Sequence, residues 1–469
     1  MEALQRLHNR GSISTGYDID NSIKLEDDND EFLTRTNASG TNRKTWTVSV
    51  WFKQTELASM RNSYTEIWDG GVFGEGTRMG MDNTDRFWID IGGGTGNTGT
   101  NYRNFSTLKL RDTSAWYHLV VALDTTQSTA ANRLKVWLNG TEITAWDQQQ
   151  IPAQNYQCAV EAGVTMTWGA YNATYHGFSG YLAECNYVDG VTATQNDFGE
   201  YDEDTGIWKP KEYTGSYGTN GCYLDFSDAS DLGANAKGND ANFTLNNITS
   251  ADQATDTPTN NFATFNPLLP NSSEKEGATV FINPDAGADT NLSTISVANG
   301  KWYAEFKASS NISGDNGMVG VAANSGDSID GRFLGQDAWS VGLLTNGSYY
   351  INSSATSYLG TTFNQDIISV ALDMDNKKVY FAKNGTWGNS GNPATGTNGI
   401  ALPSAYEDYE WFIGTSLVLS TATYDGNYGG YTVISIASGN TDANGYGTFE
   451  YAPPSGYYAL CTKNLEEFG

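Results

Sequence analysis

The sequence predicts an all-β protein, with two β-sandwich domains joined by an extended linker and preceded by a short N-terminal arm. Glycine (52 of 469 residues) and aromatic residues (13%) are abundant, while charged residues make up only 17%. This composition is typical of turn-rich β proteins, since helical proteins favour Ala, Leu, Glu, Lys and Arg. Apolar and polar residues alternate in many short runs, and one long stretch poor in aromatic residues divides these runs into two groups.

Residues 1–14 are predicted to form the arm. In EALQRLHNRG, Leu4 and Leu7 lie three residues apart, and Gly11 can end a helical turn. A helix of this length is not stable alone. Two interpretations follow, namely an arm that becomes ordered on a partner and a frayed terminus.

The first domain, residues 15–228, follows from strand patterns. In TWTVSVWFK (45–53), every second residue from Trp46 onwards is large and apolar, which predicts a strand with one strongly buried face. RLKVWLNG (133–140) alternates in the same way, and its Asn139-Gly140 is a strong signal for a tight turn. Further strands are expected at 116–124, 166–171 and 178–190. Short strands separated by turn signals indicate a β-sandwich.

The composition then changes. Residues 228–261 contain one aromatic residue, Phe243, and consist mainly of Asp, Asn, Ala, Thr and Gly. We therefore predict an extended linker over residues 229–262. Alternation returns in the second domain, residues 263–469, which has strands at 301–308 and in a strand–turn–strand unit at 367–385 that ends in the turn signal Asn384-Gly385.

Charge and motifs exclude several classes of function. The net charge of −28 repels nucleic acid and anionic membranes, but it does not exclude neutral sugars. The N-terminus lacks an apolar signal region, and no run of about 18 apolar residues occurs, so we expect neither secretion nor membrane insertion. No C-x-x-C pair occurs and the four cysteines are widely spaced, which argues against zinc sites and a disulfide scaffold. His118, inside an apolar strand, is expected to be a core histidine, and His176 a loop residue.

Stretches in both domains resemble known protein families. GYDIDNSIKLEDDNDEFLTRT (16–36) and the long closing stretch 178–228 resemble the laminin-G-like, concanavalin-A-type jelly rolls of bacteriophage virion proteins, including phages of marine bacteria. GKWYAEF (300–306) and YAPPSGYYALCTKNL (451–465) resemble a SPRY-type β-sandwich of the same kind of protein.

The resemblance implies a virion structural protein that is made in the host cytoplasm, and since no catalytic set is apparent in the sequence we expect it to be non-enzymatic. Its expected role is a tail fibre or fibre-like appendage that attaches to host-surface glycan. The alternatives are a capsid-decoration or tail-assembly protein that contacts only other proteins, and a polysaccharide depolymerase. Other virion proteins are expected to bind residues 1–14. A homo-oligomer is expected, with a trimer suggested by other fibre proteins, although no heptad repeat is present.

The acidic stretch FGEYDEDTGIWKP (198–210) decides whether an enzyme is expected. Some jelly-roll glucanases carry E-x-D-x-x-E or E-x-D-x-E, but Asp204 stands where the last Glu of the shorter pattern would be. Thr205-Gly206 breaks the strand that such a site needs, so we predict no catalytic residues. Asp202 and Asp204 are weak calcium candidates, and a self-capped turn is the alternative. No other cofactor is expected. Trp208 is expected to fix this turn to the core, with Lys209 and Lys211 offsetting its charge.

Aromatic residues in polar, glycine-rich settings are the candidates for glycan binding, because sugar faces stack on Trp and Tyr rings. The alternative is that these rings fill a core or a subunit contact. The six candidates are Trp208, Tyr213, Tyr217, Trp387, Tyr428 and Tyr431.

Overall fold

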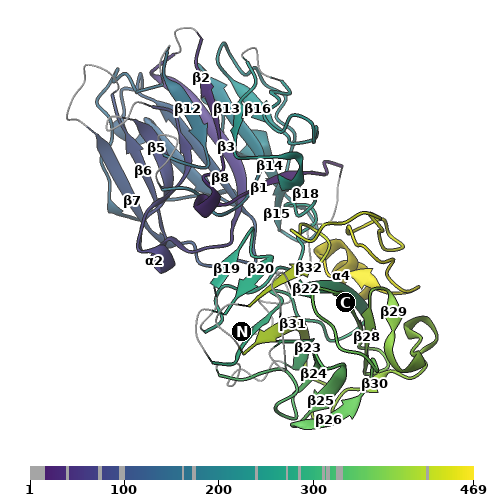
Figure 1. The fold of residues 1–469 in the computed structure, drawn as a ribbon. Helices are drawn as coiled ribbons and strands as arrows, with labels where there is room; N and C mark the ends of the chain where they lie inside the picture. Colours follow the sequence, from purple (N-terminus) through teal and green to yellow (C-terminus); the bar gives the residue numbers. More distant parts are fainter. Residues whose placement is uncertain are drawn as a thin grey trace. The chain divides into compact units, whose positions relative to one another are not determined.

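The structure is a computed structural model, and its fold is all-β, as predicted. The described residues form two compact units, with the boundary between Thr259 and Asn260 (Figure 1). The predicted arm, residues 1–14, lies outside the described residues. No helix in the described part of the chain is long and apolar enough to cross a membrane. The structure describes residues 16–38, 42–71, 76–93, 101–160, 163–171, 176–237, 241–270, 273–283, 287–308, 312, 317–323, 331–418 and 422–469.

The first unit is a sandwich of two antiparallel sheets. The sheet around β3, called the β3 sheet, has the order β10 (Thr141–Glu142), β9 (Leu134–Leu138), β8 (Tyr117–Asp124), β3 (Thr45–Gln54), β13 (Gly180–Asp189), β1 (Ser22–Leu25) and β18 (Gln253–Ala254), with β16 (Cys222–Leu224) beside β13. The β6 sheet has the order β11 (Trp146–Gln148), β7 (Tyr102–Lys109), β6 (Arg86–Ile91), β5 (Thr77–Met81), β4 (Thr65–Asp69), β12 (Thr165–Trp168), β2 (Phe32–Thr36) and β17 (Thr244–Asn246).

Alternation along these strands builds the core between the two sheets. Trp46, Val48, Val50 and Phe52 of β3 are fully buried in it, which confirms the strand and its predicted face. The predicted strands at 116–124, 133–140, 166–171 and 178–190 are confirmed as β8, β9, β12 and β13. Since the apolar faces of both sheets pack against each other, the surfaces of this unit that are available to a ligand are the outer faces and the loops.

The outer face of the β3 sheet is covered by the chain that follows β13. Phe198, Tyr213 and Tyr217 from this segment pack with Val120 of β8 and Val188 of β13 in a second buried cluster. The segment also forms a short hairpin of β14 (Gly199–Tyr201) and β15 (Trp208–Pro210). The first unit therefore has three layers, and its closing segment is part of the packing.

Residues 229–262 differ from the predicted extended linker, because residues up to Thr259 belong to the first unit. Strands β17 and β18 pair with β2 and β1. Phe243 and Ile248 are buried in the core between the sheets. Few apolar side chains are needed here, since two buried ion pairs, one from Asp252 and one from Asp256, also attach the segment. The segment is therefore folded into the first unit, although its polar composition predicts a linker.

The second unit is another sandwich. The β22 sheet has the order β19 (Ser273–Lys275), β20 (Val280–Ile282), β32 (Thr423–Asn427), β22 (Lys301–Ala308), β27 (Ile367–Asp373), β28 (Lys378–Lys383) and β29 (Thr386–Trp387), with β30 (Ile400–Ala401) beside β28 and β33 (Tyr458–Ala459) beside β22. The β23 sheet has the order β21 (Asp289–Leu292), β31 (Trp411–Leu417), β23 (Gly317–Ala323), β24 (Ser340–Leu344), β25 (Ser348–Ile351) and β26 (Ser354–Ser357).

The second unit repeats the packing plan of the first. Its main core lies between the two sheets, and a second buried cluster joins Tyr303 and Tyr380 of the β22 sheet to Phe449 and Tyr457 of the closing segment. The chain ends in helix α4 (Thr462–Phe468), drawn in yellow in Figure 1. In each unit, therefore, a late segment of that unit covers the outer face of one sheet.

A buried carboxylate marks the β-bulge in β13. Glu184 has a φ of 51° at the point where the register with β3 shifts. Its two oxygens accept hydrogen bonds from the hydroxyls of Tyr17 (2.7 Å) and Tyr223 (2.6 Å). Burial is the main cause that raises the pKa of Glu184 from 4.5 to about 7.

This carboxylate makes the stability of the first unit depend on pH. The folded state holds the proton more tightly than the unfolded chain, so the contribution of Glu184 is complete below pH 4.5 and is lost as pH rises to about 7. We expect Glu184→Gln to remove about 1–3 kcal/mol of this pH dependence. Urea unfolding at pH 5 and pH 8 measures it, with the exposed Glu203→Gln as control. Equal pH dependence in the two variants would contradict this account.

Candidate functional site

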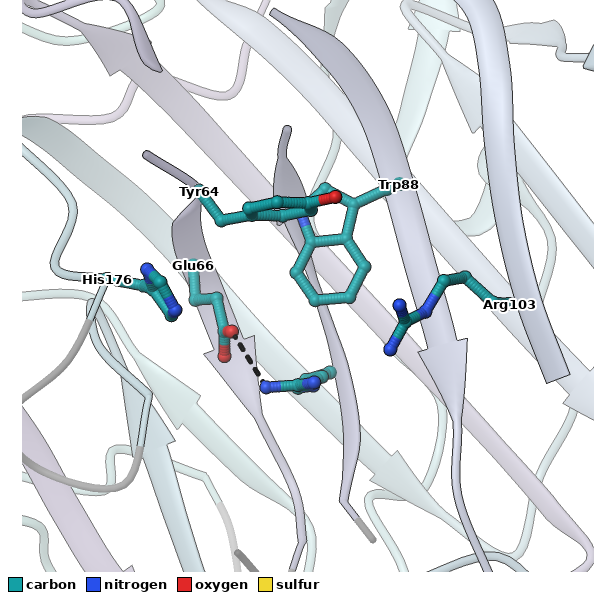
Figure 2. Close-up of a pocket in the computed structure, with 6 residues that line it drawn as sticks. Tyr64, Glu66, Trp88, Arg103 and His176 are labelled. Atoms are coloured by element: carbon teal, nitrogen blue, oxygen red, sulfur yellow. Dashed lines mark hydrogen bonds and ion pairs between the residues drawn. The ribbon is translucent and has the colours of Figure 1, made fainter. Parts of the chain in front are cut away.

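A small cavity opens on the outer side of the β6 sheet. Its volume is about 160 Å³, below the roughly 300–1,000 Å³ of sites for drug-sized ligands, so it can accept a single small ring. Figure 2 shows side chains from neighbouring strands and loops converging on it. The lining residues are Tyr64, Glu66, Arg78, Trp88, Arg103 and His176.

Strand alternation places these side chains. In β6, Phe87 and Ile89 point into the core, so Trp88 points to the outer face. Gly80 of β5 lies between Glu66 and Trp88 in the strand register. A Cβ at Gly80 would come within 1.9 Å of the Thr65 carbonyl oxygen, so only glycine lets β4 and β5 approach this closely.

Opposite charges alternate across three neighbouring strands. Arg78, Asp90 and Arg103 are register partners on β5, β6 and β7. Arg103 Nη2 lies 3.0 Å from Asp90 Oδ2, and Arg78 Nη2 lies 3.7 Å from the same oxygen. Arg78 Nη1 also lies 3.3 Å from Glu66 Oε1, the contact drawn as a dashed line in Figure 2. The cross-strand pairs fix both guanidinium groups before any ligand binds.

Aromatic rings surround the guanidinium group of Arg78. Its Cζ lies 4.3 Å from the ring centroid of Tyr171 and 5.3 Å from that of Trp88. Tyr64 meets Trp88 edge to face at 5.3 Å, and Tyr171 stacks on His176 at 6.2 Å. The rings therefore form walls of fixed orientation around the polar groups.

Burial changes the protonation of two groups in the cavity. It is the main cause that raises the pKa of Glu66 well above its ordinary value, although Arg78 opposes this effect. Burial and then Arg78 lower the pKa of His176, which favours the neutral imidazole. Glu66 Oε2 and Trp88 Nε1 are buried without a hydrogen-bond partner. Neither atom is accessible from the cavity, so the polar groups that a ligand can reach are the guanidinium groups of Arg78 and Arg103, which are 15% and 42% exposed.

The cavity provides contacts for a bound ligand. It offers stacking surfaces, two guanidinium groups and further hydrogen-bonding atoms. These are the contacts that a polar ring with several hydroxyl groups requires. Among the residues that the structure describes, no three His, Cys, Asp or Glu side chains gather to hold a metal ion.

The structure does not bring the six predicted glycan-binding rings together. Trp208, Tyr213 and Tyr217 are buried in the first unit, and Tyr428 is buried in the core of the second. Trp387 and Tyr431 are half-buried in the second unit. A sugar needs an exposed ring face, so the four buried rings have structural roles in place of the expected binding role.

His118 and Trp208 support each other as a buried pair. Trp208 Nε1 donates to His118 Nδ1 at 2.9 Å, so Nε2 carries the imidazole hydrogen and donates to Ser49 Oγ at 2.9 Å. Burial lowers the pKa of His118 to about 3, which keeps the ring neutral. His118 is thus a satisfied core histidine, and Trp208 fixes the β14–β15 hairpin to the core, as the sequence predicts.

The acidic turn of the same hairpin is self-capped. Asp202 Oδ1 accepts hydrogen bonds from the backbone N–H groups of Asp204 (3.1 Å) and Thr205 (2.9 Å). The bonds from Thr205 lower the pKa of Asp202. Lys209 lies 3.3 Å from Asp202 and 3.5 Å from Glu200, and so offsets their charge as expected. These contacts match the predicted capped turn, while calcium at Asp202 and Asp204 stays a prediction.

Sequence reasoning missed every lining residue of the cavity except His176, which it treated only as a loop residue. One signal was available: in RFWIDI (86–91), Arg86, Trp88 and Asp90 alternate with apolar residues, so this strand has a polar outer face that includes a tryptophan. The partners on β4, β5 and β7 could not be assigned without the strand order.

Comparisons with known proteins identify part of the second unit. The matched stretch runs from the start of β22, through the β27–β28 hairpin, to residues just beyond β29. Residues 301–394 match the SPRY domain family. The predicted SPRY resemblance is thus confirmed for these residues. No curated protein matches the chain.

Several solved structures resemble the chain at low identity. The SPRY domain of human HERC1 is 18% identical, covering 34% of this chain and 96% of its own, with a TM-score of 0.29. A heptameric SAP-like pentraxin from Limulus polyphemus is 15% identical, covering 39% and 82%, with a TM-score of 0.28. A candidate carbohydrate-binding protein from Bacteroides ovatus is 15% identical, covering 50% and 60%, with a TM-score of 0.33. These likenesses concern the fold alone.

Proposed function

We propose that this chain is a non-enzymatic adhesin of a phage virion, and that the cavity on the β6 sheet binds a sugar residue of a host-surface glycan. The observation that carries the proposal is the convergence of Trp88, Tyr64 and two guanidinium groups on one small cavity. The resemblance of residues 16–36 and 178–228 to phage jelly rolls motivates the virion location. In this proposal the chain acts as a tail fibre or fibre-like appendage.

The chemistry of the cavity favours a sugar ring over an apolar ligand. A hydrocarbon would cover the guanidinium groups of Arg78 and Arg103 without offering them a hydrogen-bond acceptor, at a cost of about 1–3 kcal/mol for each donor left unpaired. A pyranose ring can offer hydroxyl oxygens to both groups.

We expect Arg103→Ala to weaken glycan binding about tenfold, because the variant removes one positioned donor and about 1.4 kcal/mol of contact energy. Arg103 is 42% exposed, and its buried partner Asp90 keeps Asn101 at 3.3 Å and Arg78 at 3.7 Å, so we expect the variant to stay folded. Arg111, which is 53% exposed and pairs with the buried Asp85, gives a matched control outside the cavity. Retention on bacterial surface polysaccharides measures the difference between the two variants.

The remaining roles give different results in the same experiment. A depolymerase would release reducing ends from the polysaccharide, and we expect none. A capsid-decoration or tail-assembly protein would bind no glycan and would leave the wild type and Arg103→Ala alike. Failure of the wild type to bind any host polysaccharide would remove the adhesive part of the proposal.

A further inference from the structure

A lysine and two carboxylates form a buried group in the first unit. Lys24 of β1 is 1% exposed, Glu31 is 5% exposed, and Asp252 is 6% exposed. Lys24 Nζ lies 2.8 Å and 3.0 Å from the two oxygens of Glu31, and 2.9 Å from Asp252 Oδ1. One amine therefore contacts two carboxyl groups in a largely buried site.

The two oxygens of Asp252 have different environments. Oδ1 lies beside the Lys24 amine. Oδ2 accepts hydrogen bonds from the backbone N–H of Thr249 at 2.8 Å and from the Thr249 hydroxyl at 3.2 Å. Two donors at one carboxyl oxygen stabilise the negative charge that develops there when a nucleophile attacks the carbon. The Asp252 carboxyl is thus polarised on one side and faces an amine on the other.

We propose that Lys24 and Asp252 condense to an intramolecular isopeptide bond, with Glu31 as the proton-transfer group. Glu31 first takes one proton from the Lys24 ammonium, which frees the lone pair of Nζ to attack Cγ of Asp252 and form the C–N bond. This proton and a second one from the nitrogen pass through Glu31 to Oδ1, the C–Oδ1 bond breaks, and Oδ1 leaves as water. Oδ2 remains as the amide oxygen on Thr249, and no oxidant or external reagent is consumed.

The surroundings support each step. Burial is the main cause that raises the pKa of Glu31, which suits this group to accept a proton from the amine. Contact between the reacting groups in the folded state replaces a bimolecular encounter. Condensation also removes two buried charges, whose desolvation is costly, and replaces them with a neutral amide. The bond would join β1 to the residue just before β18, independently of any glycan binding.

Mass spectrometry of the denatured full-length chain tests the proposal. We expect an intact mass lower than that of the sequence by one water, and a proteolytic peptide in which Lys24 is joined to Asp252. The full sequence mass would overturn the proposal. A succinimide at an aspartate also loses water, so a lighter chain that yields only linear peptides would overturn it as well.

Two variants separate bond formation from packing. Lys24→Arg keeps the positive charge but cannot condense in this way, so we expect a folded chain of full sequence mass. Glu31→Gln keeps the shape but removes the proton acceptor, and we expect the linked peptide to be lost. Circular dichroism confirms that each variant is folded. A linked peptide that persists in folded Glu31→Gln would refute the role of Glu31.

Discussion

Replacement of Lys53 by methionine is expected to lower the free energy of unfolding of the first unit by about 3–5 kcal/mol. Lys53 Nζ lies 2.8 Å from Asp256 Oδ2, and the two side chains are 0% and 1% exposed. Trp116 Nε1 donates to the other oxygen, Asp256 Oδ1, at 2.9 Å. Without the lysine, the buried Asp256 carboxylate loses the cation that compensates its charge.

Two measurements report this effect, namely denaturant unfolding of the full chain and hydrogen exchange of the backbone amides in β1 and β18. The double variant Lys53→Met/Asp256→Leu removes both charges, and we expect it to recover most of the lost stability. The exposed Lys109 on β7 is the matched control, and Lys109→Met is expected to change stability by less than about 0.5 kcal/mol. Equal losses of unfolding free energy in the single and double variants would show that these two side chains stabilise the unit through packing and not through their charges.

Strand prediction succeeded where the pattern is local. The alternation of Trp46, Val48, Val50 and Phe52 specifies a strand and its buried face without knowledge of any partner. The same holds for the Asn139-Gly140 and Asn384-Gly385 turns. In both, the asparagine has a φ of 46° and the glycine a φ near 76–77°, the left-handed conformation that such hairpin turns require. Local sequence patterns were therefore sufficient to predict the two β-sandwiches.

The predictions that differed from the structure depend on contacts between distant residues. Tyr428 sits in a polar, glycine-rich stretch, yet it is buried because Phe265 and Phe306 pack against its ring. The 229–262 segment has only two aromatic residues, Phe243 and Phe262, yet ion pairs with the buried Lys24 and Lys53 help to fix its residues up to Thr259 to the first unit. The hydrophobic pattern of a sequence does not reveal a buried ion pair, because charged residues are assigned to the surface.

The candidate cavity was hidden for a related reason. Its members come from four strands and from loops that are more than 100 residues apart, so only the order β4, β5, β6, β7 brings them together. Sequence alone could show that Trp88 faces away from the core. It could not show that Arg78 and Glu66 face the same space.

The second large effect is expected in the second unit, at Glu305 of β22. This side chain is fully buried on the face that the closing segment covers. Its oxygens accept hydrogen bonds from the backbone N–H groups of Tyr451 (2.8 Å) and Glu450 (2.9 Å), and from the Tyr303 hydroxyl (2.9 Å). One carboxylate thus satisfies two donors of a segment more than 140 residues away in sequence.

Glu305→Ala should therefore destabilise the second unit by about 2–4 kcal/mol, because the Glu450 and Tyr451 amides lose their acceptor in a buried site. Hydrogen exchange reports the cause directly, since these two amides should exchange faster while amides of the β23 sheet change less. Glu466→Ala, on the exposed side of α4, is the control and should be nearly neutral. If the two amides stayed protected in folded Glu305→Ala, another acceptor would hold the closing segment, and Glu305 would be only a tolerated buried charge.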